Sequence, residues 1–428
     1  MATVLRLVLL VIIFCGSAPG ARTQELDVNQ EAGLAPLPQV ANYGICKSMV
    51  EIHGYVCQEH TVTTEDGYIL SLQRIPAGRS SGDTPQERRP VLLQHGVLVD
   101  GAIWLLNLPH QSLAFILADG GFDVWIANSR GTKWSRGHTS LSSDDPAYWD
   151  WSWDQFVEYD LPATFQYVHH QTGKKIYYVG HSQGTLIALA SFSQEKLLNL
   201  LKSAALLSPI AYLGQVPCPL ARSAAEVFIA ELEFYLLITT CFCFFMCTTS
   251  FPWRLGVDEF DPKGKAVDKL LKAICNKPGI NCYNLFTSFT GKNCCLNSST
   301  VDFFLEYEPQ STATKNMIHL AQMIRGGSIT MYDYGDKDKN VKHYGQPTPP
   351  VYNMSGIPSD IPLYLSYGGK DKLSDVNDIQ ALLYSLKDHD RDKLVVQYQE
   401  DYAHADFVMA MNAKQMVYDS PMAFFRLH

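Results

Sequence analysis

The segment Gly180-His-Ser-Gln-Gly184 carries a serine between two glycines and is the one GxSxG match in the 428-residue chain. The apolar run 176–179 ends directly before it, and the apolar run 185–192 begins directly after it. A tight turn from strand to helix needs small flanking residues, because glycines let the backbone bend without a Cβ clash and so lift the serine hydroxyl above the sheet. We therefore predict Ser182 as a nucleophile, in preference to a capping serine in an ordinary glycine turn.

A serine hydroxyl needs a neighbouring base before it can attack a carbonyl group. Where a serine lies on such a turn, an acid and then a histidine follow it in the chain, each in a loop after a later strand. The apolar run 363–366 is followed by Gly368-Gly-Lys-Asp371, and the run 394–398 is followed by Tyr402-Ala-His404. These positions predict Asp371 as the acid and His404 as the base.

Other acidic and histidine side chains compete for these roles. Asp375 and Asp378 lie farther from the strand, at the expected start of a helix, where capping explains an aspartate. His389 is the nearest rival of His404, but it lies in the charged run 387–392, which is typical of a solvated loop. We favour Asp371 and His404 over all three.

The oxyanion of a tetrahedral intermediate needs two hydrogen-bond donors. One is expected from the backbone N–H of Gln183, directly after the nucleophile, and the other from Val97, in the loop that begins with His95-Gly-Val97. We expect His95 to brace that loop by hydrogen bonding and His181 to pack behind the turn. The sequence indicates no metal site and no cofactor, because the cysteines and histidines show no zinc-ligand spacing.

Alternating strand and helix patterns surround these residues. A hairpin is expected over 61–74, with its turn at Glu65-Asp66-Gly67, followed by a polar linker over 76–90. Short apolar runs fit strands that are buried on both faces of a parallel sheet, and amphipathic segments separate them. The apolar runs are 91–94, 124–127, 176–179, 204–207, 363–366 and 394–398; the helical segments are 111–118, 156–171 and 377–386. This alternation predicts an α/β fold with a mostly parallel sheet.

The alternation stops between 210 and 344, a segment with most of the remaining cysteines and helical character around 312–324. We interpret it as a helical cap or lid domain inserted into one hydrolase core. The predicted organisation is a signal peptide over 1–24, an amino-terminal segment and hairpin over 25–90, core over 91–209, the cap over 210–344 and core again over 345–428.

Several features predict a secreted chain. Arg6 precedes a short apolar run and a group of small residues, as in a secretory signal peptide, and the run is too short for a comfortable bilayer span. The chain has 11 cysteines, of which Cys46 and Cys57 could close a small loop, although connectivity stays open. Glycosylation sequons begin at Asn297 and Asn353. We expect the secretory pathway, with an extracellular or vacuolar/lysosomal destination.

The overall charge excludes some partners. A net charge of -9 provides no basic field for nucleic acid or anionic lipid, so contact with lipid must be apolar.

The aromatic run Tyr148-Trp-Asp-Trp-Ser-Trp153 is either core packing, which we favour, or an acyl-binding wall. Asp160, near Pro162, is either a buried carboxylate or a residue at the start of a helix.

The sequence resembles the acid lipase family of gastric and lysosomal lipases and their plant relatives, within the α/β-hydrolase superfamily. The shared motifs extend over nearly the whole chain, and Cys294-Cys-Leu-Asn297 is most similar to the plant branch. They include 67–76, Leu93-Gln-His-Gly96, Asn128-Ser-Arg-Gly131, Tyr159-Asp-Leu-Pro162, Gly180–Gly184, Gly368–Asp371 and Ala403-His-Ala-Asp-Phe407. The resemblance implies hydrolysis of triacylglycerols or sterol esters at a lipid–water interface beneath a mobile lid. It also implies the triad Ser182, Asp371 and His404, with oxyanion donors at Val97 and Gln183.

One segment departs from the family pattern. Residues 234–247 are strongly apolar, and removal of 233–252 would join 230–232 to 253–256 with good continuity. We favour a non-native insert, such as a retained intron; a genuine apolar lid or a monotopic membrane anchor are the alternatives.

The predicted activity is lipase hydrolysis through an acyl-enzyme. The competing functions are an idle lipid-binding protein on the same fold, or a serine acyltransferase or thioesterase.

Overall fold

The computed structural model describes residues 44–79, 88–217, 222, 225, 258–263, 287 and 289–428. The predicted signal peptide over 1–24 and the apolar segment 233–252 lie outside these residues. The strands are β1 Gln58–Thr63, β2 Tyr68–Ile75, β3 Arg89–Gln94, β4 Phe122–Ala127, β5 Gly137–His138, β6 Ile176–His181, β7 Leu201–Leu207, β8 Glu259–Phe260, β9 Thr312–Ala313, β10 Leu363–Gly368 and β11 Leu394–Gln399. The helices are α2 Leu113–Asp119, α3 Trp153–Gln155, α4 Leu161–Thr172, α5 Gln183–Ser193, α9 Ser298–Tyr307, α10 Thr314–Gly326, α11 Lys337–Tyr344, α12 Val376–Ser385, α13 Asp406–Met409 and α14 Asp419–Leu427.

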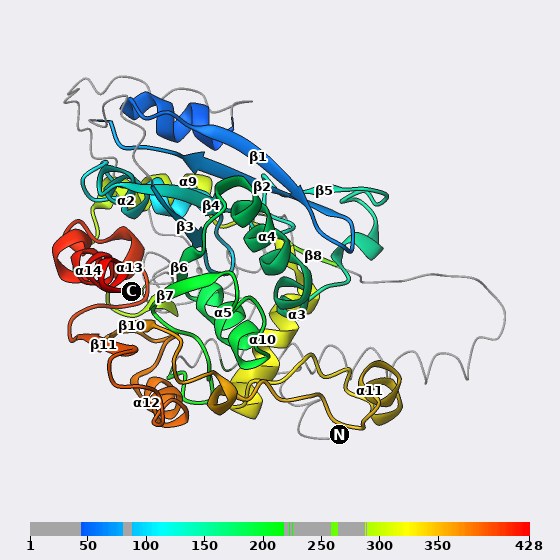
Figure 1. The fold of residues 1–428 in the computed structure, drawn as a ribbon. Coiled ribbons are helices and arrows are strands. Elements are labelled where there is room, and N and C mark those ends of the chain that lie inside the picture. Colours follow the sequence, from blue (N-terminus) through cyan, green and yellow to red (C-terminus); the bar gives the residue numbers. More distant parts are fainter. Residues whose placement is uncertain are drawn as a thin grey trace, which may run out of the picture. The chain divides into compact units, whose positions relative to one another are not determined.

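One large sheet organises the described residues (Figure 1). Its strand order is β1-β2-β4-β3-β6-β7-β10-β11, with β5 paired to β2. The pairs from β4 to β11 are parallel, whereas β1 and β2 form an antiparallel hairpin that joins β4 antiparallel. The predicted α/β-hydrolase fold with a mostly parallel sheet is confirmed, and each of the six apolar runs that were predicted as strands is a strand.

Side chains alternate between two cores on the two faces of this sheet. On one face, Leu92, Trp125 and Tyr178 pack with the helices α4 and α5. On the other face, Leu93 and Val124 pack with α2, α13 and α14. Because both faces are covered, strands β4, β6 and β10 are buried at every position. The central strands therefore form a rigid platform between two helical layers.

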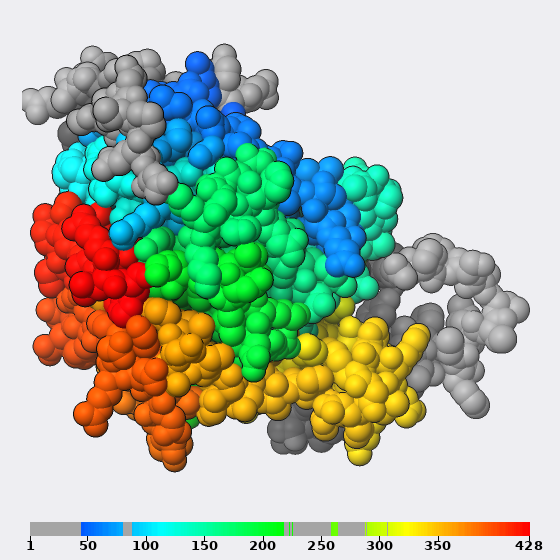
Figure 2. Space-filling model, in the orientation of Figure 1, coloured from blue at the N-terminus to red at the C-terminus, as the bar shows by residue number. Residues whose placement is uncertain are grey.

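Strand β11 differs from the prediction of burial on both faces. It pairs only with β10 among the described strands, and Val395, Val396 and Tyr398 are exposed. Figure 2 shows the C-terminal segment, in red, adjoining the orange segment that precedes it in the chain. An apolar run at the edge of a sheet has the same sequence pattern as a central strand, and for this reason the pattern could not reveal the exposure.

The predicted cap falls between β7 and β10. The described residues of this stretch contain the small β8–β9 sheet and the helices α9, α10 and α11. The 210–344 boundaries stay a prediction.

The structure pairs Cys46 with Cys57 in a disulfide and the adjacent Cys294 with Cys295. Within the described ranges, no helix combines the length and apolar character needed to cross a bilayer.

Candidate active site

Ser182 lies on a strained turn between β6 and α5. Its backbone has φ 55° and ψ -123°, a conformation that non-glycine residues rarely adopt. A Cβ at Gly184 would lie 2.4 Å from the carbonyl oxygen of Gln94, so only glycine fits where helix α5 meets strand β3. The Ser182 N–H donates to the Leu207 carbonyl at 3.2 Å, and the Thr185 hydroxyl donates to the Ser182 carbonyl at 2.6 Å. These local contacts support the turn that the sequence predicts.

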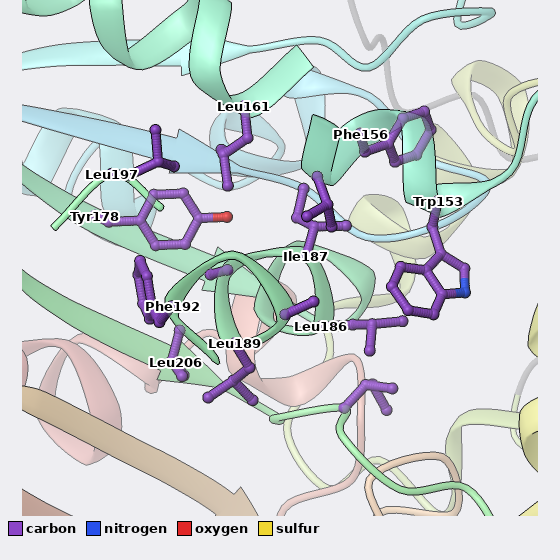
Figure 3. Close-up of a cluster of buried hydrophobic side chains, with 14 of the residues drawn as sticks. Trp153, Phe156, Leu161, Tyr178, Leu186, Ile187, Leu189, Phe192, Leu197 and Leu206 are labelled. Carbon is purple, nitrogen blue, oxygen red and sulfur yellow. The ribbon is translucent and has the colours of Figure 1, made fainter. Parts of the chain in front are cut away.

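Helix α5 is surrounded by apolar side chains on nearly all sides (Figure 3). Leu186, Ile187 and Phe192 project from the helix, and Trp153 lies beside its first turns. The Tyr178 hydroxyl adds a hydrogen bond of 2.6 Å to the Gly184 carbonyl. The helix that begins behind Ser182 is thus anchored by packing as well as by its connection to the sheet.

The loop after β3 passes directly over Ser182. A Cβ at Gly96 would lie 2.7 Å from the Ser182 Cβ and 3.2 Å from its hydroxyl oxygen. Val97 and Gln183 line the same small cavity, together with Thr312 from the cap segment. The structure therefore brings both candidate oxyanion donors to one place beside the serine.

His95 braces this loop, as predicted. Its Nδ1–H donates to the Gly96 carbonyl at 2.7 Å, and its Nε2 accepts the Ser129 N–H at 3.0 Å. This pair of bonds requires the neutral imidazole, since Nε2 must be free to accept. Burial lowers the pKa of His95 to about 4, which keeps the ring neutral over most of the pH range.

His404 and Asp371 form a buried pair. The imidazole Nδ1 lies 3.0 Å and 3.1 Å from the two carboxylate oxygens. The carboxylate also accepts N–H bonds from Leu373 and Ser374, at 2.9 Å and 2.8 Å. Burial alone would raise the pKa of Asp371, but the His404 imidazole and these N–H groups outweigh it and lower the pKa. An ionised Asp371 fixes the proton of His404 on Nδ1 and leaves Nε2 with its lone pair.

His404 also contacts the serine turn. The Nε2–H of His181, the residue before Ser182, donates to the His404 carbonyl at 3.0 Å, and the two rings lie 4.8 Å apart. Burial, followed by the His404 ring, lowers the pKa of His181 to about 3. The His404 Nε2 is buried and has no hydrogen-bond partner within the described part of the chain. The sequence indicated only packing for His181, and the structure adds a direct bond between the two loops.

A segment of the predicted cap binds the loops of both Asp371 and His404. We call residues 290–296 the strap. Gly291 forms an antiparallel bridge with Asp371, and the His404 N–H donates to the Thr290 carbonyl at 3.0 Å. Farther along, the Met411 N–H donates to the Cys295 carbonyl at 2.9 Å. The strap thus joins two loops that follow different strands.

Asp406 fastens the strap to the histidine loop, a role that the sequence analysis missed. Its carboxylate accepts N–H bonds from Ala403 at 2.8 Å, Cys294 at 3.1 Å and Cys295 at 3.2 Å. Burial raises the pKa of Asp406, although these three bonds act in the opposite direction. An acidic residue two positions after a candidate histidine was the available signal, but its two partners in the strap lie more than a hundred residues away.

The rival residues lie in other hydrogen-bond arrangements. Asp375 caps α12 by accepting the Asn377 N–H at 2.8 Å, and Asp378 accepts the Gln215 N–H at 3.0 Å. His389 Nε2 bonds to the Ile361 carbonyl at 2.7 Å. None of these contacts involves Ser182. The capping interpretation is confirmed for Asp375 and is wrong for Asp378, which lies within α12 and bonds to Gln215.

The two open alternatives beside the site are resolved by burial. Asp160 is a buried carboxylate that pairs with the fully buried Arg130, which also pairs with Asp66 of the hairpin turn. Tyr148, Trp149, Trp151 and Trp153 are all buried in the core on the α5 side of the sheet, as the packing interpretation predicts. No group of three metal-ligand side chains occurs among the residues that the structure describes.

Known proteins resemble this chain along most of its length. Residues 46–108 match the family described as a partial alpha/beta-hydrolase lipase region, and residues 89–233 match the alpha/beta hydrolase fold. Triacylglycerol lipase 2 of Arabidopsis thaliana is 50% identical over 394 residues, which cover 91% of this chain and 90% of that protein. Gastric triacylglycerol lipase of Rattus norvegicus is 37% identical over 393 residues, which cover 90% of this chain and 92% of that protein. A solved soluble variant of monoglyceride lipase from Saccharomyces cerevisiae has the same fold, with a TM-score of 0.52 at 15% identity over 92% of this chain and 99% of that chain.

Proposed function

The chain belongs to the family of α/β-hydrolase lipases, and on that basis we propose that it hydrolyses carboxylic esters of neutral lipids through a serine acyl-enzyme. Triacylglycerols and sterol esters are the proposed substrates. The observation that carries the proposal is the buried His404–Asp371 pair, bonded through His181 to the turn that presents Ser182. No cofactor is part of the proposed chemistry.

In the proposed mechanism, His404 accepts the hydroxyl proton of Ser182 while the serine oxygen attacks the ester carbonyl. Asp371 keeps the imidazole in the required tautomer and stabilises its positive charge. The backbone N–H groups of Val97 and Gln183 bind the oxyanion. The proton on His404 then passes to the leaving alcohol, and water releases the fatty acid from Ser182 by the same sequence of steps.

The surroundings of the site support an interfacial reaction in the secretory pathway. Cap residues such as Thr312 line the small cavity beside Val97 and Gln183, so the predicted lid over 210–344 would control access of a lipid ester. The Cys46–Cys57 disulfide supports an oxidising compartment, extracellular or vacuolar/lysosomal.

One side-by-side assay tests the proposal. Purified protein is given emulsified triolein, a sterol ester and a short soluble ester, and release of acid is followed on each. We expect hydrolysis of the emulsified lipids and covalent labelling of Ser182 by a fluorophosphonate probe. Absence of both hydrolysis and labelling would indicate an idle lipid-binding protein, and transfer of the acyl group to an alcohol in preference to water would indicate an acyltransferase.

A further inference from the structure

Two buried carboxyl side chains meet beside the candidate oxyanion loop. Asp100 is 1% exposed and Glu308 is 0% exposed. The backbone N–H of Asp100 donates to Glu308 Oε1 at 3.1 Å across 208 positions of sequence. Asp100 ends the loop that contains Val97, whereas Glu308 directly follows helix α9 in the predicted cap. The contact therefore joins the loop that contains Val97 to the cap segment that contains Glu308.

Neighbouring bonds extend this junction toward Ser182. The Gln310 N–H donates to the Leu98 carbonyl at 2.8 Å, and the Gln310 side-chain oxygen accepts the Lys133 N–H at 3.0 Å. Thr312, two residues farther, lines the cavity that Val97 and Gln183 share. Movement of Glu308 away from Asp100 would remove one of the contacts that hold the loop of Val97, the proposed oxyanion donor, to the cap segment.

The surroundings of the two carboxyl groups differ. Asp100 accepts the Ala102 N–H at 2.7 Å and lies near the positive charge of Lys133. Glu308 Oε2 is buried with no donor from the described residues. Burial and the adjacent Asp100 raise the pKa of Glu308 well above its ordinary value. Burial raises the pKa of Asp100 as well, so we expect the pair to retain one proton where exposed carboxyls have none; placed on Glu308, this proton can be donated to Asp100.

Charged groups from other elements also face the pair. Among the described residues these are Lys133, in the loop after β4, and Lys263, after β8, whose own charge is near Asp261. Because folding raises the pKa of Glu308, the stabilisation that its proton provides is complete at a pH below its pKa in the unfolded chain. That stabilisation is lost as the pH rises through its pKa in the folded chain. The junction should therefore weaken on the alkaline side.

We propose that Glu308 is a positioning residue for the oxyanion loop and acts in its protonated form, in which it fastens the cap segment to Asp100. When the proton leaves, two carboxylates face each other in a buried site, and the loop that carries Val97 loosens. The proposal rests on the hydrolase function proposed above. It predicts a decline of turnover at alkaline pH and assigns that decline to the Asp100–Glu308 pair.

The test compares Glu308→Gln with the wild type, because a glutamine amide donates to Asp100 and accepts its N–H without a titrating proton. Values of kcat and KM on a short soluble ester are measured from pH 4 to 9. We expect the alkaline decline in kcat to move upward by at least about one pH unit in Glu308→Gln, with KM within about twofold of the wild type. Glu308→Ala should lower kcat at every pH, and Glu195→Gln, the same change at an exposed position, should reproduce the wild-type profile.

Two results would overturn the proposal: superimposable profiles of Glu308→Gln and the wild type, or a wild-type kcat with no alkaline decline. If Glu308→Gln does not fold, Asp100→Asn places the amide on the other partner and should shift the decline in the same direction. Thermal unfolding tests this proposal separately from the proposed hydrolase function. The melting temperature of Glu308→Gln relative to the wild type should rise with pH even if no ester is hydrolysed. If the enzyme hydrolyses esters but the pH profile of kcat is the same in Glu308→Gln and the wild type, only the positioning role of Glu308 is contradicted.

Discussion

The proposed nucleophile and the proposed base are held by different kinds of structure. Ser182 follows β6, which lies between β3 and β7 and is buried at every position. His404 follows β11, which lies at the edge of the sheet with three exposed apolar side chains. The serine turn is fixed mainly by contacts within a few residues and by adjacent strands, although His181 also bonds to the His404 carbonyl. The histidine loop instead depends on the strap and on Asp406, which connect it to the cap.

Within one site, the position of Ser182 thus depends mainly on nearby residues of the sequence, whereas the position of His404 depends on contacts with distant segments. A buried central strand and its following helix can present a side chain without help from remote segments. A loop at a sheet edge has fewer neighbours, and its position must be fixed by elements that arrive from elsewhere in the chain. The four predictions below test the two arrangements in order of decreasing effect on activity.

Ser182→Ala should abolish ester hydrolysis without loss of the fold. Removal of the hydroxyl removes the nucleophile but little packing, and loss of a triad serine costs on the order of 10⁶-fold in kcat. Initial rates and thermal melting measure the two effects. Retention of more than about a tenth of the wild-type rate would remove Ser182 from the mechanism.

Asp371→Asn should lower kcat by ~10⁴-fold, because an asparagine of the same shape favours the wrong histidine tautomer. The matched controls are Asp375→Asn, which changes only a helix cap, and Asp378→Asn, which changes a bond to Gln215. Both should retain rates within a few-fold of the wild type. A more severe loss in Asp375→Asn would reassign the acid to that residue.

Asp406→Asn should lower kcat by about 10- to 100-fold with little change in KM, since a part-buried N–H group of the strap would lose its acceptor, at about 1–3 kcal/mol. Asp401→Asn changes an exposed residue of the same loop and should be neutral. If Asp406→Asn proved as active as Asp401→Asn, the histidine loop would be as self-contained as the serine turn, and the contrast between the two regions would disappear.

Deletion of 233–252 should leave activity equal or higher and improve soluble yield, because an uncharged run of aromatic, β-branched and cysteine residues invites wrong pairing during folding. The deletion leaves the strap intact, so it asks whether the histidine depends on the strap alone or on the entire cap. Activity is measured on emulsified triacylglycerol and on a soluble ester. A selective loss on the emulsion would identify the segment as an authentic lid or anchor.

The sequence could predict the parts of the molecule that are locally encoded. The serine turn, its flanking strand and helix, and the loop positions of Asp371 and His404 all depend on patterns only a few residues long. The roles of Asp406, Glu308 and the strap could not be predicted, because each depends on a contact between segments that the fold alone brings together. The exposure of β11 was missed for a related reason: an apolar run records which residues can form a strand, but not where that strand lies in the sheet.

Strands β7 and β10 are hydrogen-bonded neighbours, with Leu363 opposite Ala204, although about 150 residues separate them in the chain. Because the two strands are parallel, the connection between them leaves the sheet at the carboxyl end of β7 and returns to it at the amino end of β10. For a connection already this long, a change of some 20 residues alters the entropy of loop closure by only roughly 0.1 kcal/mol. Over evolutionary time, the entropy of loop closure alone therefore places almost no limit on the length of the cap.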